Sequence, residues 1–169
     1  MRPLNVVIAT AVGITLFLLD LKFGTLSFIF GGFPSVITIA VITAIVAGDI
    51  GDGFLSCLFY EVLGVTIVVF AHPFLYPEWE IATSDLFTTF IVVMILAVEN
   101  SFDSSPWPWI LAPILIALLF IIAPLVFLAG LIASLIGGLI GRFLHARILG
   151  RDYSRPAPQR PPVEEGVLE

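Results

Sequence analysis

The sequence predicts an all-α protein, a polytopic transmembrane helix bundle of six or, alternatively, five spans. Of its 169 residues, 59% are hydrophobic and 12% are charged, and the mean hydropathy is +1.12. Soluble domains carry about a quarter charged residues, so this chain could not cover its surface in water. Its apolar residues form long unbroken blocks, which is typical of helices in lipid. The length suits one compact bundle.

Charge and composition exclude several functional classes. The formal net charge is -6 and no basic stripe is present, which argues against nucleic-acid binding. Cys57 is the single cysteine and excludes an internal disulfide, and the two histidines lie too far apart for a zinc site of usual spacing. Neither His72 nor His145 has a nucleophile and an acid nearby. We therefore expect no enzymatic activity, no cofactor and no metal.

The first predicted span covers residues 4–20. Arg2 followed by an apolar block resembles a secretory signal, but no small-x-small cleavage site follows it, so we interpret the block as an uncleaved span. Residues 23–33, rich in glycine and aromatic side chains, are expected to cross, dip into or lie on the membrane. The second span, residues 34–48, begins at Pro34, whose missing N–H costs nothing in the first turn of a helix.

A polar break separates the second span from the third. It reads Gly48-Asp49-Ile50-Gly51-Asp52-Gly53, and two aspartates among glycines are typical of a turn. Asp49 and Asp52 could bind a hard cation together with loop carbonyls, but a plain turn is the simpler interpretation. The third span, residues 54–71, is expected to end at His72-Pro73.

The fourth span is expected at residues 85–99, and the remaining apolar segment allows two interpretations. From Trp107 to Gly141 the sequence carries no charge. A single helix of this length would be about 52 Å long, against about 30 Å for the hydrocarbon core of a bilayer. Either the segment turns at Ala123-Pro124, with spans at 107–123 and 125–146, or it is one long helix kinked at Pro124. We favour the hairpin, which gives six spans.

The membrane bundle is expected to occupy residues 1–149, followed by a Pro-rich cytoplasmic tail at 150–169 that is too polar to fold and is expected to be disordered. Five of the seven basic residues cluster at the C-terminal end. The positive-inside rule therefore predicts a multi-pass protein of the cell membrane with a cytoplasmic C-terminus. Six spans would place the N-terminus in the cytoplasm as well. The five arginines are Arg142, Arg147, Arg151, Arg155 and Arg160.

Small residues recur four positions apart in two of the predicted spans. At this spacing they form narrow stripes along which another backbone can approach closely, and such contacts hold helices together in lipid. Two interpretations stay open: packing between helices of this chain, or contact with a second copy or another membrane subunit. The rows are Ala129, Ala133, Gly137 and Gly141; Gly130, Ser134 and Gly138; and Ala40, Ala44 and Gly48.

Glu61 is the acidic residue placed deepest within an apolar span. An ionised carboxylate there costs several kcal/mol, so it is expected to be protonated, paired or facing a wet cavity. Gly53, Cys57, Glu61 and Gly64 follow one another three or four positions apart, which directs Glu61 toward neighbouring helices. Glu61 is either a proton or cation site or a structural hydrogen-bonding group. The candidate hydrogen-bond partners are Thr38, Thr43 and Thr66.

The glycine-aspartate break at 48–53 and the segment Leu135-Ile136-Gly137-Gly138-Leu139-Ile140-Gly141 resemble small multi-pass archaeal membrane proteins of unknown function. The resemblance implies a membrane bundle and transfers no functional residues. The leading hypothesis is a non-enzymatic membrane subunit or scaffold that packs through its small-residue faces. The alternative is a small transport component, similar to the substrate-binding subunits of vitamin-uptake transporters, or a proton or ion pathway through Glu61.

Overall fold

The computed structural model of the protein describes residues 3–26, 35–75, 86–101 and 112–149. The predicted tail and residues 27–34, 76–85 and 102–111 lie outside this part. These residues include most of the predicted 23–33 segment and the beginning of the span predicted at 107–123. The described residues form five helices and no strand, which confirms the all-helical class. The helices are α1 (Pro3–Phe23), α3 (Ser35–Ala47), α4 (Ile50–Leu75), α5 (Leu86–Ser101) and α6 (Ala112–Leu149).

Three of the described helices are long and apolar enough to cross a membrane. These segments are Pro3–Phe23, Ile50–Ala71 and Ile121–Ile148, whereas the apolar stretches Ser35–Ala47 and Leu86–Ala97 are shorter. At 1.5 Å per residue, the 13 residues of α3 reach about 20 Å, less than the thickness of a hydrocarbon core. The prediction of six spans is therefore not confirmed.

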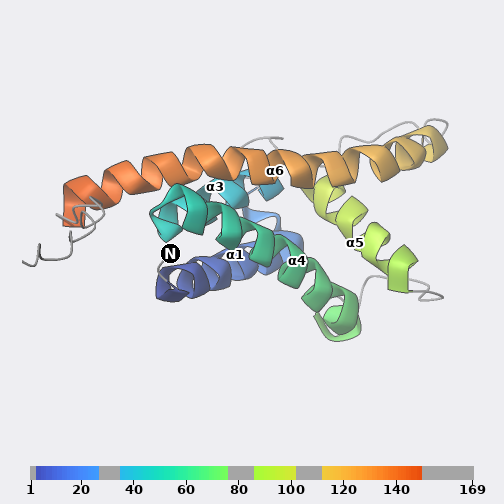
Figure 1. The fold of residues 1–169 in the computed structure, drawn as a ribbon. Coiled ribbons are helices and arrows are strands. Elements are labelled where there is room, and N and C mark those ends of the chain that lie inside the picture. Colours follow the sequence, from blue (N-terminus) through green and yellow to red (C-terminus); the bar gives the residue numbers. More distant parts are fainter. Residues whose placement is uncertain (1–2, 27–34, 76–85, 102–111, 150–169) are drawn as a thin grey trace, which may run out of the picture.

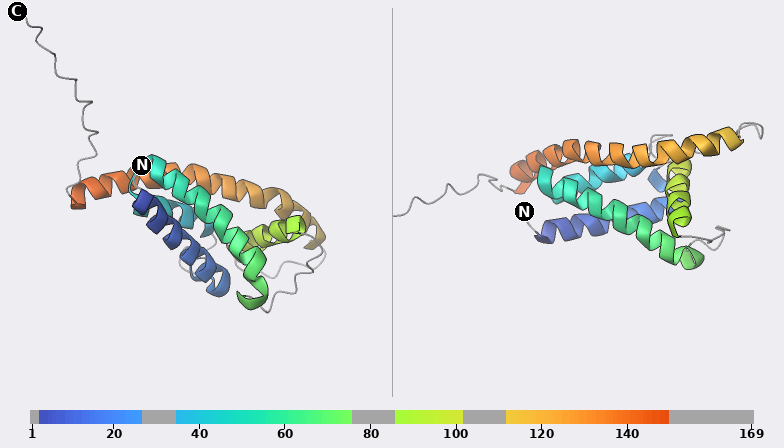
Figure 2. Two further views of the ribbon diagram at one scale, coloured as in Figure 1. Left: turned by 60° about the horizontal axis from the view of Figure 1, so that its bottom comes forward. Right: turned by 45° about the vertical axis from the view of Figure 1, so that its right-hand side comes forward.

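The helices form three layers. Figure 1 shows α6 on one side, α1 on the opposite side, and α3 and α4 between them, while α5 leans against α6 and α4 (Figures 1 and 2). Helix α1 runs parallel to α4, since Ser56 donates a hydrogen bond to the Val6 carbonyl and Gly64 lies against Phe17. Helix α6 runs parallel to α3 and antiparallel to α4.

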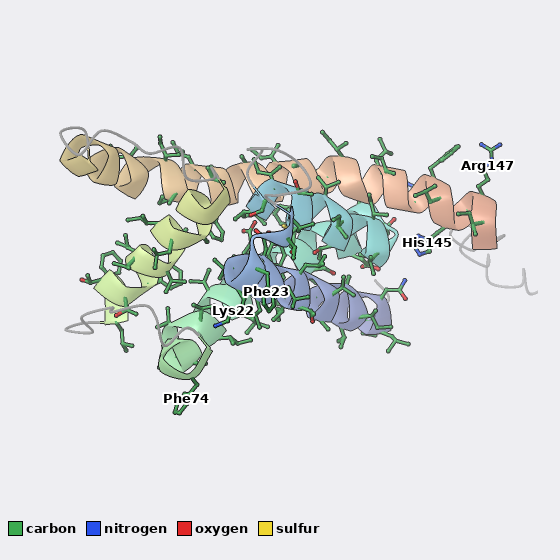
Figure 3. The ribbon with its side chains drawn as sticks, turned by 180° about the vertical axis from the view of Figure 1, so that it is seen from behind. Lys22, Phe23, Phe74, His145 and Arg147 are labelled. Atoms are coloured by element: carbon green, nitrogen blue, oxygen red, sulfur yellow. The ribbon has the colours of Figure 1, made fainter. Side chains whose placement is uncertain are left out.

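The start of α1, the turn between α3 and α4 and the last turns of α6 lie at one end of the bundle, which we call the turn end. The Asn5 side chain donates a hydrogen bond to the Ala47 carbonyl over 3.3 Å, and the His145 ring lies against Gly48. Lys22 and Phe74 lie at the opposite end, as Figure 3 shows. The chain therefore enters and leaves its described helices at the same end.

Apolar side chains cover both the interior and the outward surface. The core is built from side chains of every described helix, with Phe17, Tyr60 and Phe127 in aromatic contact at its centre. Outward faces of α1, α4 and α6 carry large apolar side chains that are more than a third exposed. Several polar side chains, in contrast, are buried between helices. On α6 the exposed residues include Leu125, Leu128, Ile132, Leu135, Ile136 and Leu139.

The predicted polar turn between the second and third spans is shorter in the structure. Gly48 ends α3 with a φ of 76°, a conformation that glycine adopts at little cost, and Asp49 caps α4. Its carboxylate accepts a hydrogen bond from the Gly51 amide over 3.2 Å. The prediction that Gly51, Asp52 and Gly53 belong to the turn is wrong, because they lie in the first turn of α4, which also continues past His72-Pro73.

The predicted hairpin at Ala123-Pro124 is wrong, because α6 continues through Pro124 as one helix of 38 residues. A proline removes one backbone hydrogen bond, whereas a turn within lipid would leave several backbone groups without partners. The Pro124 ring lies on the exposed side of α6, while Ala123 beside it is fully buried. The spans predicted at 107–123 and 125–146 are therefore parts of one helix where the structure describes them.

Helices α3 and α6 form the most extensive pair, and their glycines lie directly on the partner backbone. A Cβ atom added to Gly137 would lie 2.6 Å from the Val41 carbonyl oxygen, and one added to Gly141 would lie 2.6 Å from that of Ile45. At each position a Cα–H of the glycine points toward a carbonyl one turn apart on α3. This geometry is typical of weak Cα–H···O contacts between closely packed helices.

Most of the small residues in these rows are thus buried in contacts between helices of the same chain. Ala40 and Ala44 are fully buried on α3, and Ala44 lies against Gly53 of α4 as well as Gly137 of α6. Gly138 lies on the backbone of Asp49 and Ile50. Ala129 and Ala133 are half-buried at the edge of this contact.

We predict that Gly137→Ala lowers the free energy of unfolding by about 1–3 kcal/mol, because the added methyl group must separate α3 from α6. Thermal unfolding in detergent micelles measures the change. Gly51→Ala is the matched control: its Cβ would lie 3.7 Å from the Asp49 carboxylate, an ordinary contact. This control is expected to gain about 0.5–1 kcal/mol from helix propensity. Equal stability of Gly137→Ala and the wild type would contradict the packing described above.

Candidate functional site

Glu61 lies in the interior of the bundle, where α3, α4 and α6 meet. Its side chain is 6% exposed, and it comes from the middle of α4. A Cβ atom added to Gly130 of α6 would lie 2.8 Å from Glu61 Oε1, 3.5 Å from Ala40 and 3.8 Å from Val36. The absence of a side chain at Gly130 therefore leaves the space that the carboxyl group occupies.

The hydrogen-bond partner of Glu61 is a cysteine on its own helix. The Cys57 thiol donates to Glu61 Oε1 over 3.5 Å, one helical turn away. Cys57 also interacts with the side chain of Ser134 on α6. The Ser134 hydroxyl itself donates to the Leu131 carbonyl over 2.7 Å. Cys57, Glu61 and Ser134 therefore form a small buried polar cluster between α4 and α6.

Two of the three threonines predicted as candidate partners of Glu61, Thr43 and Thr66, do not fill that role, and for Thr38 it stays a prediction. Thr66 donates to the Val62 carbonyl of its own helix over 2.6 Å. The Thr43 hydroxyl lies beside Gly13 of α1 and is buried without a hydrogen-bond partner. Sequence spacing placed Glu61 on the correct face of α4 but did not indicate that Cys57, a weak donor, lies nearest to it.

Glu61 differs from the two other buried carboxylates of the described residues, Asp20 and Asp52. Asp20 accepts a hydrogen bond from the Leu26 amide over 2.7 Å just beyond the end of α1. Asp52 lies in the first turn of α4, where the helix dipole favours negative charge. Glu61 is not close to an end of its own helix, because it lies in the middle of α4, where the backbone amides bond within the helix. Its carboxyl group depends on side chains and on neighbouring helices.

The N-terminus of α3 lies close to the Glu61 carboxyl group. Helix α3 begins at Ser35, which is buried, and the Tyr60 hydroxyl donates to the Val36 carbonyl over 2.9 Å. Val36 and the Glu61 carboxyl group are both within 4 Å of one point beside Gly130. The first turn of a helix carries partial positive charge, so α3 offers a favourable field for the ionised form of Glu61. Helix α3, which has only 13 residues, therefore begins inside the bundle, beside the buried Glu61 of α4.

A second group of buried polar side chains lies between α1, α3 and α4. Asn5 and Ser56 connect these helices through the hydrogen bonds described above, and Ser56 also donates to the Asp52 carbonyl over 2.7 Å. The Thr10 and Thr43 hydroxyls are buried without partners. At Gly13 an added Cβ would lie 2.6 Å from Thr43 Oγ1 and 2.8 Å from Tyr60 Cβ. The isolated polar residues of the apolar segments were the sequence signal for this group, but their spacing did not pair them across helices.

The aspartates at the α3–α4 turn have structural roles. Asp49 caps α4, and Asp52 is buried in the first turn of that helix. Among the described residues, no group of three or more histidine, cysteine or acidic side chains could hold a metal ion. The candidate site is therefore a single carboxyl group with thiol and hydroxyl neighbours.

The sequence matches no family model, and neither a curated protein nor a solved structure matches the chain.

We predict that Cys57→Ala lowers the free energy of unfolding by about 1–3 kcal/mol, because it removes the hydrogen-bond donor to a buried carboxyl group. Cys57→Ser is the matched variant, since its hydroxyl restores a donor of similar size, and it is expected to lose less stability. Thermal unfolding of both variants in detergent micelles gives the comparison. Equal losses would show that the thiol acts through its volume and not through the hydrogen bond.

Proposed function

We propose that this protein is an integral membrane protein without enzymatic activity, a small transport component in which Glu61 takes up and releases a proton. The outward apolar faces of α1, α4 and α6 support insertion into lipid, because such faces would be unstable in water. The described end of α6 carries Arg142 and Arg147, which supports a cytoplasmic location for the turn end.

The observation that carries the proposal is the position of Glu61. Acidic side chains inside membrane helices are costly and typically mark ion or proton pathways. Two opposing effects act on this carboxyl group: burial among apolar side chains favours the neutral form, and the N-terminus of α3 favours the ionised form. A group held between these effects can exchange a proton.

A metal cation fits the site less well than a proton does. Hard cations bind six or more oxygen ligands. The groups beside Glu61 include the Cys57 thiol and the aliphatic side chains of Ala40 and Val36. The Ser134 hydroxyl, beside Cys57, donates its proton to the Leu131 carbonyl. The proton is therefore the ion that we propose for Glu61.

The second candidate function is that of a membrane subunit that packs against another copy or a different membrane protein. Gly137 and Gly141 are occupied by α3 and leave little surface for a partner. Ala129 and Ala133 continue the same row but are only half-buried, which leaves a narrow strip of α6 accessible to another helix. This strip favours the second candidate.

We predict that Glu61→Gln abolishes proton flux through the protein while the fold persists, because the amide keeps the shape of the side chain and cannot titrate. Proteoliposomes containing a trapped pH-sensitive dye measure the flux when valinomycin imposes a potassium diffusion potential. Wild-type protein is expected to acidify or alkalinise the lumen according to the sign of the potential.

Thr66→Val is the matched control, since it removes a hydroxyl from the same helix that is bonded to its own backbone. This variant is expected to retain wild-type flux. Absence of flux in the wild type, or equal flux in Glu61→Gln, would contradict the proton-carrying role.

For the second candidate, we predict that Ala133→Leu reduces the oligomer to a monomer and changes the stability by less than about 1 kcal/mol, because position 133 has space at the edge of the bundle. Native mass spectrometry of protein extracted in mild detergent measures the stoichiometry. Leu128→Ala on the outward face is the control and is expected to leave it unchanged. A monomeric wild type would exclude a stable oligomer.

A further inference from the structure

The last turns of α6 change character on the outward face. Up to Ile140 the exposed side chains are apolar, and then two exposed arginines, Arg142 and Arg147, follow among exposed apolar residues that include Leu144 and Ile148. Phe143 lies between them in sequence and is 62% exposed. The Arg147 guanidinium lies over the Phe143 ring, with its carbon 5.9 Å from the ring centroid, within the range of a cation–π contact.

The length of the apolar face locates this change relative to a bilayer. Phe143, Leu144 and Ile148 are exposed beside the arginines. From Ile121, the first residue of α6 whose side chain the structure describes, to Ile140, the exposed side chains of this helix are all apolar. At 1.5 Å per residue this stretch spans about 30 Å, which equals the thickness of a hydrocarbon core. If Ile121 to Ile140 cross that core, Arg142 and Arg147 reach the level of the phospholipid headgroups. Phe143 would lie at the boundary between the hydrocarbon core and the headgroups.

The neighbouring residues leave the arginines directed outward. His145, on the inward side of the same turns, lies against Gly48 and interacts with the Gly141 carbonyl over 2.9 Å. Figure 3 shows His145 directed toward the bundle and Arg147 directed away from it. Asp49, which lies at the turn end, caps α4 by accepting a hydrogen bond from the Gly51 amide.

We propose that Arg142, Phe143 and Arg147 form a binding site for the headgroup of an anionic phospholipid at the turn end. The two guanidinium groups supply charge and forked hydrogen-bond donors for the phosphate, and the Phe143 ring contacts the adjoining glycerol and acyl region. Helix α6 itself presents these side chains, so the site needs no rearrangement of the bundle. The proposal does not depend on proton exchange at Glu61.

Native mass spectrometry of the full chain released from nanodiscs tests the site. The nanodiscs contain equal amounts of phosphatidylglycerol and phosphatidylcholine, and the ratio of the two lipids retained on the protein is measured. Wild-type protein is expected to retain phosphatidylglycerol preferentially. The double variant Arg142→Gln/Arg147→Gln is expected to reduce this preference roughly tenfold or more, since each basic residue contributes about 1 kcal/mol at an anionic surface.

Two further variants separate the site from a general effect of charge. Lys22→Gln removes a positive charge from the opposite end of the bundle and is expected to leave the preference unchanged. Arg142→Lys/Arg147→Lys keeps both charges but removes the forked donors, and it is expected to retain less of the preference than the wild type. An unchanged lipid ratio in the double glutamine variant, or an equal reduction in Lys22→Gln, would overturn the proposal. Both arginines are exposed, so the variants are expected to unfold at the wild-type temperature.

Discussion

The close approach of α3 and α6 organises the rest of the bundle. Gly137 and Gly141 lie on the backbone carbonyls of Val41 and Ile45, so the two helix axes come nearer than larger side chains would permit. In lipid, helices gain little from excluding solvent and depend on such dispersion and Cα–H···O contacts. The same approach brings α6 against the α3–α4 turn at Gly48. It therefore fixes the arrangement of the turn end.

The depth of α3 determines the environment of Glu61. Because α3 has only 13 residues and is fixed to α6 near the turn end, its N-terminus lies inside the bundle. Val36 then lies beside Gly130, and the Tyr60 hydroxyl reaches the Val36 carbonyl. Glu61 extends into the space that Gly130 leaves. Packing through glycines and placement of the buried acid are thus two consequences of one helix arrangement.

The two ends of the bundle have different chemistry. At the turn end, short polar contacts such as Asn5 to the Ala47 carbonyl connect the helices, and the outward face of α6 becomes basic. At the opposite end, Lys22, Phe23 and Phe74 are exposed (Figure 3). An apolar surface between these two ends is expected of a protein that crosses a bilayer, because its ends lie in water and its middle lies in lipid.

The sequence by itself determined the helical class, most helix positions and the face of Glu61, because hydropathy and three- or four-residue spacing are local properties. It also indicated glycine stripes suited to close helix contact. Only the tertiary structure decided that α6 continues through Pro124, since a lone proline allows either a turn or a helix and the surroundings select between them. Likewise, pairing Cys57 with Glu61 and Gly130 with the carboxyl group depends on rotamers and interhelical distances, which no local pattern specifies.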